Sequence, residues 1–127
     1  MPGSGDLIHI SERRGVKLVR MRTEALRTEA EVEALGRGLM GLAEEPGTRV
    51  VLSFLGVKHL TSLVLGRLIH VHKRLAESGG ELRLADIHPQ LFEIFSITRL
   101  DRLFKIFERE DEAVASFVGD VEGQGVA

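Results

Sequence analysis

The stretch from Arg49 to Gly80 constrains the fold of this chain more than any other part of the sequence. It begins with the apolar run Val50 to Phe54, which is short and rich in β-branched residues, as expected for a strand buried on both faces. From Val64 onward, apolar residues recur every three or four positions, which predicts an amphipathic helix with one stripe facing a core. Gly79-Gly80 supplies the stop after that helix. A buried strand that leads into a core-facing helix is a building unit of α/β folds.

Periodic patterns elsewhere in the chain extend this unit on both sides. Thr28 and Glu31 have the spacing of a capping box at a helix start, and Gly15 suits the positive φ of a hairpin turn. The patterns predict a hairpin over 7–22, a helix over 29–44, a strand over 81–85, a short helix from Pro89, a strand over 103–107 and a closing helix over 111–118. Together they predict an α/β fold, with a mixed sheet of four to five strands and about four helices packed against it.

Length and composition fit one domain outside the secretory pathway. A chain of 127 residues can bury a sizeable core, and the absence of cysteine excludes disulfides and thiolate metal sites. No apolar run approaches the roughly 20 residues of a membrane span, and the N-terminus lacks a signal-peptide pattern. We therefore expect a cytoplasmic protein without a membrane partner, consisting of a disordered leader over 1–6, a domain over 7–118 and a flexible tail over 119–127.

The distribution of charge is more informative than its sum. Seventeen basic and nineteen acidic side chains give a net charge of −2, which argues against a nucleic-acid partner. Between Ser53 and Ala76, however, there is no acidic residue, and the basic residues are Lys58, Arg67, Lys73 and Arg74. This basic face is either an ordinary solvated helix surface or a docking surface for an acidic partner.

The hydroxyl pair Thr61 and Ser62 stands where the central helix begins. Either side chain could cap the helix by accepting a backbone hydrogen bond. A phosphate on Thr61 would also be tolerated, because a helix N-terminus offers free N–H groups and a favourable dipole to an anion. Leu63 projects among the polar residues of the helix, so we expect it to be an exposed contact residue.

Residue types that carry catalysis or bind metals are present, but their spacing does not support a site. Ser62, His59 and Asp86 supply the groups of a hydrolase triad, yet no G-x-S-x-G elbow surrounds any serine. His70 and His72 lie about 200° apart around a helix and cannot share a metal ion. Phosphate-cradling glycine motifs are also absent. We predict a binding protein rather than an enzyme, with no cofactor and no metal.

Two long stretches of the sequence resemble the STAS domain, a module named after sulphate transporters and anti-sigma factor antagonists. They are VVLSFLGVKHLTSLVLGRL and GGELRLADIHPQLFEIFSITRLDRLFKIF, and the likeness spans about Leu7 to Val118. Soluble members are phosphorylated by an anti-sigma kinase on a hydroxyl at the start of the second helix, and their unmodified form binds that kinase. In this chain Thr61 matches the phosphoacceptor and Ser62 the hydroxyl that follows it.

The resemblance implies an anti-sigma factor antagonist whose partner is an anti-sigma factor, a histidine-kinase-like serine/threonine kinase. The contact surface that it implies comprises Lys58, His59, Leu60, Leu63, Arg67 and His70. The family usually has an acid before the acceptor and a glycine two residues after it, where this chain has Leu60 and Leu63. These differences favour an alternative, a phosphorylation-independent STAS scaffold that assembles with itself or with other STAS proteins.

Overall fold

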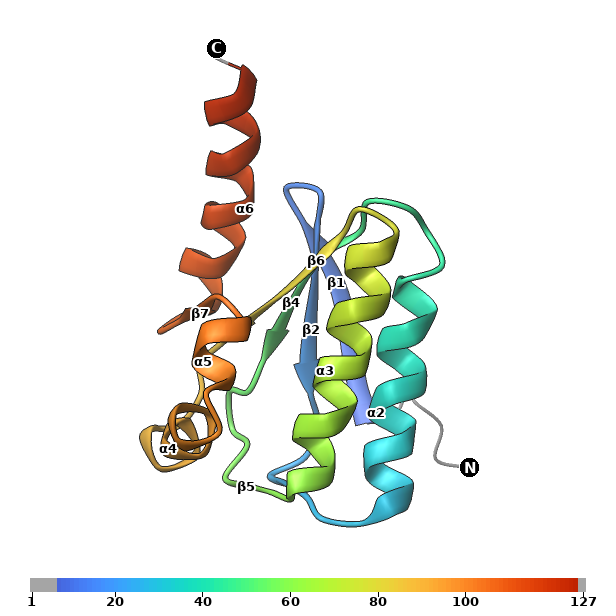
Figure 1. Ribbon diagram of the computed structural model, residues 1–127, viewed down its shortest axis with the longest axis vertical. Helices are drawn as coiled ribbons and strands as arrows, with labels where there is room; N and C mark the ends of the chain where they lie inside the picture. The colour runs from blue at the N-terminus through green and yellow to red at the C-terminus, as the bar shows by residue number, and fades with distance from the viewer. Residues whose placement is uncertain (1–6, 126–127) are drawn as a thin grey trace.

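The computed structural model describes residues 7–125, whose strands form a five-stranded mixed sheet and a small two-stranded one (Figure 1). The large sheet has the order β1-β2-β4-β6-β7, in which β1 pairs antiparallel with β2 and all other neighbours are parallel. Its strands are β1 (Ile8–Arg13), β2 (Val16–Met21), β4 (Arg49–Ser53), β6 (Glu81–Ala85) and β7 (Ile106–Phe107). The predicted mixed α/β sheet is therefore confirmed.

The helices cover both faces of this sheet (Figure 1). They are α2 (Glu29–Leu42), α3 (Ser62–Glu77), α4 (Pro89–Ile97), α5 (Leu100–Leu103) and α6 (Glu110–Gly125). The helices α2 and α3 lie side by side on one face, α6 lies on the other, and α4 and α5 lie near the β7 end. Among the residues described, no helix is both long enough and apolar enough to cross a membrane.

The alternation of side chains along the strands divides the core into two parts. Val50 and Leu52 of β4 belong to the larger cluster, which also contains the apolar stripes of α2 and α3. Val51 points to the opposite face, where it packs with Phe117 of α6. Both faces of β4 are thus buried, as the continuous apolar run of this strand predicts.

Several predicted element boundaries are confirmed and have a local cause. At the hairpin, Arg14 and Gly15 both have positive φ, 54° and 83°, the pattern of a type I′ turn. At the start of α2, Thr28 and Glu31 form both hydrogen bonds of the capping box. The helix nevertheless ends at Leu42 and not at Glu44.

Other parts of the prediction are wrong or incomplete. A two-stranded parallel sheet, β3 (Ala25–Leu26) with β5 (His59–Leu60), was not predicted, because two-residue strands give no period-two signal. The strand expected over 103–107 is only β7, since Leu103 ends α5 and residues 104–105 belong to neither a helix nor a strand. The helix α6 was expected to end at Val118, but the described backbone is helical to Gly125. Residues 1–6, expected to be a disordered leader, and 126–127, expected to belong to the tail, lie outside the described residues.

A buried arginine holds α6 against the sheet. Arg83 of β6 is 2% exposed, and its guanidinium carbon lies 3.9 Å from the ring centre of Phe117. Its Nη1 donates a hydrogen bond of 2.6 Å to Ser116, and its Nε donates one of 2.9 Å to the Glu81 carboxylate. The cation is thus compensated by an acid, a hydroxyl and an aromatic face, as a buried charge requires.

Two carboxyl groups at the start of α6 have pKa values shifted in opposite directions. The Arg20 guanidinium donates two hydrogen bonds, of 2.9 and 2.7 Å, to Glu110 and holds the pKa of that carboxyl below its usual range. Burial raises the pKa of Asp86, and this effect outweighs the opposing one of the hydrogen bond of 2.9 Å that its Oδ2 accepts from the backbone N–H of Glu110. The charges of Glu110 and Asp111 raise it further, whereas Arg109 lowers it.

We expect Asp86→Asn to stabilise the protein at neutral pH. Asparagine keeps an acceptor oxygen and tolerates the backbone φ of 57°, while it removes a charge that folding disfavours. The gain should be about 0.5–2 kcal/mol, as for other surface-charge improvements. The raised pKa means that ionised Asp86 destabilises the folded protein at neutral pH. This destabilisation decreases as the pH falls through the raised pKa, and it is lost below the usual aspartate pKa, where the carboxyl is protonated in both the folded and the unfolded state.

Urea unfolding of the wild-type protein and the Asp86→Asn variant, at pH 7 and at about pH 3.5, tests this pH dependence. The lower pH lies below the ordinary aspartate pKa of about 3.9. The stability of both proteins should fall in acid as Glu110, with its lowered pKa, takes up a proton and loses its bond to Arg20. The difference between them should shrink in acid. A difference of the same size at both pH values would contradict the prediction.

Candidate functional site

The small sheet β3–β5 fixes the chain just before α3. The backbone N–H of Lys58 donates to the Glu24 carbonyl at 2.7 Å, and that of Thr61 donates to the Leu26 carbonyl at 3.1 Å. Leu60 is half-buried and packs on the larger core cluster. The start of α3 is therefore held in place by backbone hydrogen bonds and one apolar contact.

The two hydroxyls at this helix start have different environments. Thr61 is the N-cap residue with extended backbone, but its side chain makes no capping hydrogen bond. Its Oγ1 is buried and has no hydrogen-bond partner among the described residues. Ser62 is the first residue of α3 and is exposed. Thr61 thus has the predicted cap position but not the predicted side-chain bond, and its hydroxyl is buried whereas Ser62 is an exposed residue.

A hollow of about 440 Å³ lies between the first turns of α2 and α3. Leu63 is 54% exposed beside it, which places this leucine on the polar side of α3 as predicted. The hollow is lined from α3 by Ser62, Leu63, Gly66, Arg67 and His70, and from α2 by Glu29, Val32 and Glu33. Of the predicted contact residues, the structure therefore brings Ser62, Leu63, Arg67 and His70 together.

Arg67 is held in this hollow by α2. Its guanidinium forms an ion pair with Glu33, and its aliphatic stem lies over Gly36. A Cβ atom at Gly36 would come within 2.7 Å of the Arg67 Cδ. The glycine therefore makes room for the arginine, which leaves Arg67 oriented and partly neutralised.

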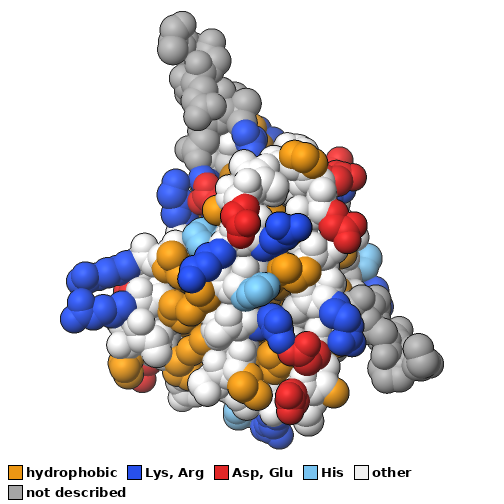
Figure 2. Space-filling model, turned by 45° about the vertical axis from the view of Figure 1, so that its right-hand side comes forward, with side chains coloured by type: hydrophobic (Ala, Val, Ile, Leu, Met, Phe, Trp, Pro, Cys, Tyr) orange, Lys and Arg blue, Asp and Glu red, His pale blue; other side chains and the backbone are white. Residues whose placement is uncertain are grey.

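The remaining predicted contact residues lie outside the hollow. Lys58 and His59 are exposed on the segment before α3 and do not line it. Arg74 lies 4.0 Å from Glu77 one turn further along α3. Figure 2 brings the α2 and α3 side of the molecule forward and shows basic and acidic side chains next to one another around apolar ones. At Arg67 the predicted basic face meets the acids Glu29 and Glu33 of α2.

The described residues do not bring the candidate triad together and hold no cluster of metal-ligating side chains. No hydrogen bond joins Ser62, His59 and Asp86, and the Asp86 carboxylate instead accepts from the Glu110 backbone. No group of three or more His, Cys, Asp or Glu side chains within the described part of the chain could hold a metal ion. The hollow combines an exposed serine, an exposed leucine and charges of both signs.

The sequence interpretation missed the wall that α2 contributes. Glu29, Glu33 and Gly36 recur at helical spacing and share one face of α2. That pattern was available in the sequence. Which neighbouring helix this face would meet was not, because helix pairing is a tertiary property.

Comparison with known proteins agrees with this fold. A Planctomyces limnophilus structure, described as an anti-sigma-factor antagonist (STAS) domain protein, superposes with a TM-score of 0.80 at 21% identity, over 87% of this chain and 97% of that one. The phosphorylated form of the Bacillus cell fate determinant SpoIIAA superposes with a TM-score of 0.62 at 18% identity, over 87% and 98%.

Similarity is also found at the level of sequence. A Thermotoga maritima protein, named as a candidate anti-sigma factor antagonist, is 29% identical over 66 residues, which are 52% of this chain. The match spans 58% of that relative, less than two thirds of its length. The sequence model of the STAS domain matches residues 8–113, most of the chain. This chain therefore belongs to the STAS domain family.

Proposed function

We propose that this protein is a cytoplasmic anti-sigma factor antagonist that binds an anti-sigma factor through the hollow between α2 and α3. The observation that carries the proposal is the exposed Ser62 at the start of α3, beside Leu63 and the oriented Arg67. The names of the relatives from Planctomyces limnophilus and Thermotoga maritima, which say anti-sigma factor antagonist, support an anti-sigma factor as the partner. We infer that this partner is a histidine-kinase-like serine/threonine kinase. The role is binding, without catalysis by this chain.

Phosphorylation at the start of α3 would control this binding. A phosphate there adds about −1.5 to −2 charges beside free backbone N–H groups, so the fold need not change. It would also stand next to Glu29 and Glu33, which line the same hollow. A partner that docks over Leu63 would then meet bulk and negative charge in place of a small hydroxyl.

Of the two hydroxyls, Ser62 is the one that a kinase reaches without a rearrangement. The Thr61 hydroxyl would first have to turn out of its buried position. We therefore extend the proposal, which the sequence centred on Thr61, to Ser62 as the more accessible acceptor.

Incubation with the cognate kinase and ATP, followed by mass spectrometry, tests the proposal. One phosphate is expected on Ser62 or Thr61, and Ser62→Ala should remove most of it if accessibility decides. Thr61→Ala is the matched variant and should leave it in place. Phosphate mapped only outside residues 60–63 would refute the proposed switch.

The hollow can be tested separately with two glycines of the same helix. Gly36→Ala should displace the Arg67 side chain, whereas an alanine at Gly41 meets no atom within 4 Å. Both changes should stabilise α2 by about 1 kcal/mol, because alanine has the higher helix propensity. At position 36, the cost of displacing Arg67 reduces this gain. Only Gly36→Ala should weaken partner binding, measured by calorimetry. Equal affinities for the two variants would show that the Arg67 position does not matter.

Exposed Leu63 and the absence of an acid before Thr61 also support a second candidate, a phosphorylation-independent scaffold. A pull-down from native cytosol separates the two. A histidine-kinase-like ATPase as prey supports the antagonist, and several STAS proteins support the scaffold.

A further inference from the structure

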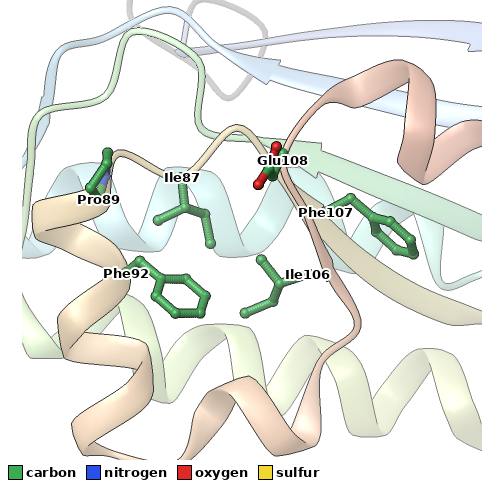
Figure 3. Close-up of a pocket in the computed structure, with 6 residues that line it drawn as sticks. All are labelled: Ile87, Pro89, Phe92, Ile106, Phe107 and Glu108. Atoms are coloured by element: carbon green, nitrogen blue, oxygen red, sulfur yellow. The ribbon is translucent and has the colours of Figure 1, made fainter.

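The edge of the large sheet at β7 is open and lies beside an apolar hollow of about 530 Å³. Figure 3 shows that Ile87, Phe92 and Ile106 point toward one another in this hollow, while the Phe107 ring points away. Phe92 is 38% exposed, and Ile87 and Ile106 are half-buried. One wall of this hollow comes from α4 and the other from β7. The hollow is therefore separate from the one between α2 and α3.

Backbone hydrogen-bonding groups of β7 face outward beside this hollow. The carbonyls of Lys105 and Phe107 accept from the N–H groups of Leu84 and Asp86, at 3.0 and 3.3 Å. Successive residues of a strand direct their polar groups to opposite sides, so the N–H and C=O of Ile106 face the open edge. An added strand could therefore pair with β7 at Ile106.

Unpaired charges of opposite sign flank the two residues of β7. Lys105 precedes the strand and Glu108 follows it, and both side chains are exposed without an ion-pair partner in the described part of the chain. Glu108, just after the strand, lines the same hollow as Ile106. Lys105 lies beside Ile106 at the same edge, where it lines a neighbouring hollow with Phe92.

We propose that this edge binds an extended segment of a partner protein as an additional antiparallel strand. Opposite Ile106, the segment carries an apolar side chain that fills the hollow, and opposite Glu108 it carries a lysine or arginine. An acidic residue stands opposite Lys105. An antiparallel segment runs from the position opposite Glu108 to the position opposite Lys105. From its N-terminus to its C-terminus it therefore has a basic residue, any residue, an apolar residue and an acidic residue.

A second copy of this chain fits the edge less well. Two identical antiparallel strands must place outward-facing residues opposite each other, so Ile106 can meet its own copy or Glu108 of that copy. Lys105 then lies opposite Phe107 in the first register and Arg109 in the second. Neither register places an acid opposite Lys105 and a base opposite Glu108. A segment of a different protein is therefore the better partner for this edge.

A fluorescent peptide, Ser-Lys-Thr-Leu-Glu-Ser, tests this proposal by anisotropy against the full-length protein. Its control is the peptide Ser-Glu-Thr-Leu-Lys-Ser, in which the two charges are exchanged. The first peptide should bind saturably and at least tenfold more tightly than the second, and the Ile106 amide should shift in NMR spectra. Binding at the α2–α3 hollow is a different measurement, so the proposed function can fail independently.

Three variants sharpen the test. Lys105→Glu combined with Glu108→Lys should reverse the preference between the peptides, and Phe92→Ala should weaken binding of the first peptide at least fivefold. Glu44→Lys, an exposed charge reversal just beyond α2, should change neither. Absence of binding, equal binding of both peptides or an unreversed preference would overturn the proposal. So would a dimer in sedimentation that Phe92→Ala dissociates, since the edge would then belong to a second copy.

Discussion

Leu68→Ala is expected to lower the free energy of unfolding by about 2–5 kcal/mol, the range for removing a leucine side chain from a packed core. Leu68 is fully buried and lies in the middle of the α3 stripe that faces the sheet. The truncation removes apolar area that folding buries and leaves a cavity that a close-packed interior fills only in part. Urea unfolding monitored by circular dichroism measures the loss.

Leu63→Ala, five residues earlier on the same helix, is the matched control. Its side chain is 54% exposed, so the loss of stability should stay well below that of Leu68→Ala. If Leu63 is a contact residue, the same change should weaken partner binding by about 1 kcal/mol or more. Equal losses of stability from both substitutions would mean that Leu63 contributes to the core, and the proposed docking surface would then be wrong.

This pair of leucines shows why much of the fold could be predicted. Helical geometry assigns each residue of α3 to a direction, so the apolar stripe and the exposure of Leu63 followed from spacing alone. The same holds for the buried run of β4, the capping box of α2 and the turn at Gly15. All of these depend on residues that are close together in the sequence.

Features that depend on distant segments could not be predicted in the same way. Arg83 alternates with Leu82 and Leu84, so the pattern grouped it with Glu81 as polar, yet α6 covers it. A long aliphatic stem, the Glu81 carboxylate and the Phe117 ring make this burial possible. No local pattern indicates that a helix some thirty residues later packs over that side chain.

The candidate site also combines features that follow from local spacing with features that depend on distant segments. The α3 side of the hollow, with Leu63 and Arg67, could be derived from the sequence. Glu33 and Gly36 could not, because their contact with Arg67 depends on the packing of α2 against α3. The burial of the Thr61 hydroxyl was missed for a related reason, since the β3–β5 pairing that orients this residue joins segments over thirty residues apart.

The adjacent glycines after α3 give a second large and specific prediction. Gly79 has a φ of 84°, a conformation that costs other residues about 1–2 kcal/mol, so Gly79→Ala should destabilise the protein by that amount. Gly80 has no positive φ, but a Cβ atom there would overlap the backbone carbonyl oxygen of Thr48 and lie 3.1 Å from its carbonyl carbon. Gly80→Ala should therefore be the more severe change, costing about 3 kcal/mol or more, the upper end for overpacked sites.

The clash at Gly80 cannot be relieved by turning a side chain. The Thr48 carbonyl accepts the backbone N–H of Glu81 at 3.2 Å, and Thr48 directly precedes β4. Any shift of Thr48 therefore disturbs the first pair of the β4–β6 ladder, which joins Arg49 and Glu81. Thermal unfolding of the two alanine variants measures the difference. A Gly80→Ala protein as stable as the Gly79→Ala protein would mean that β6 can move away from β4 at this end without loss, and that the close approach of Thr48 is not required by the sheet.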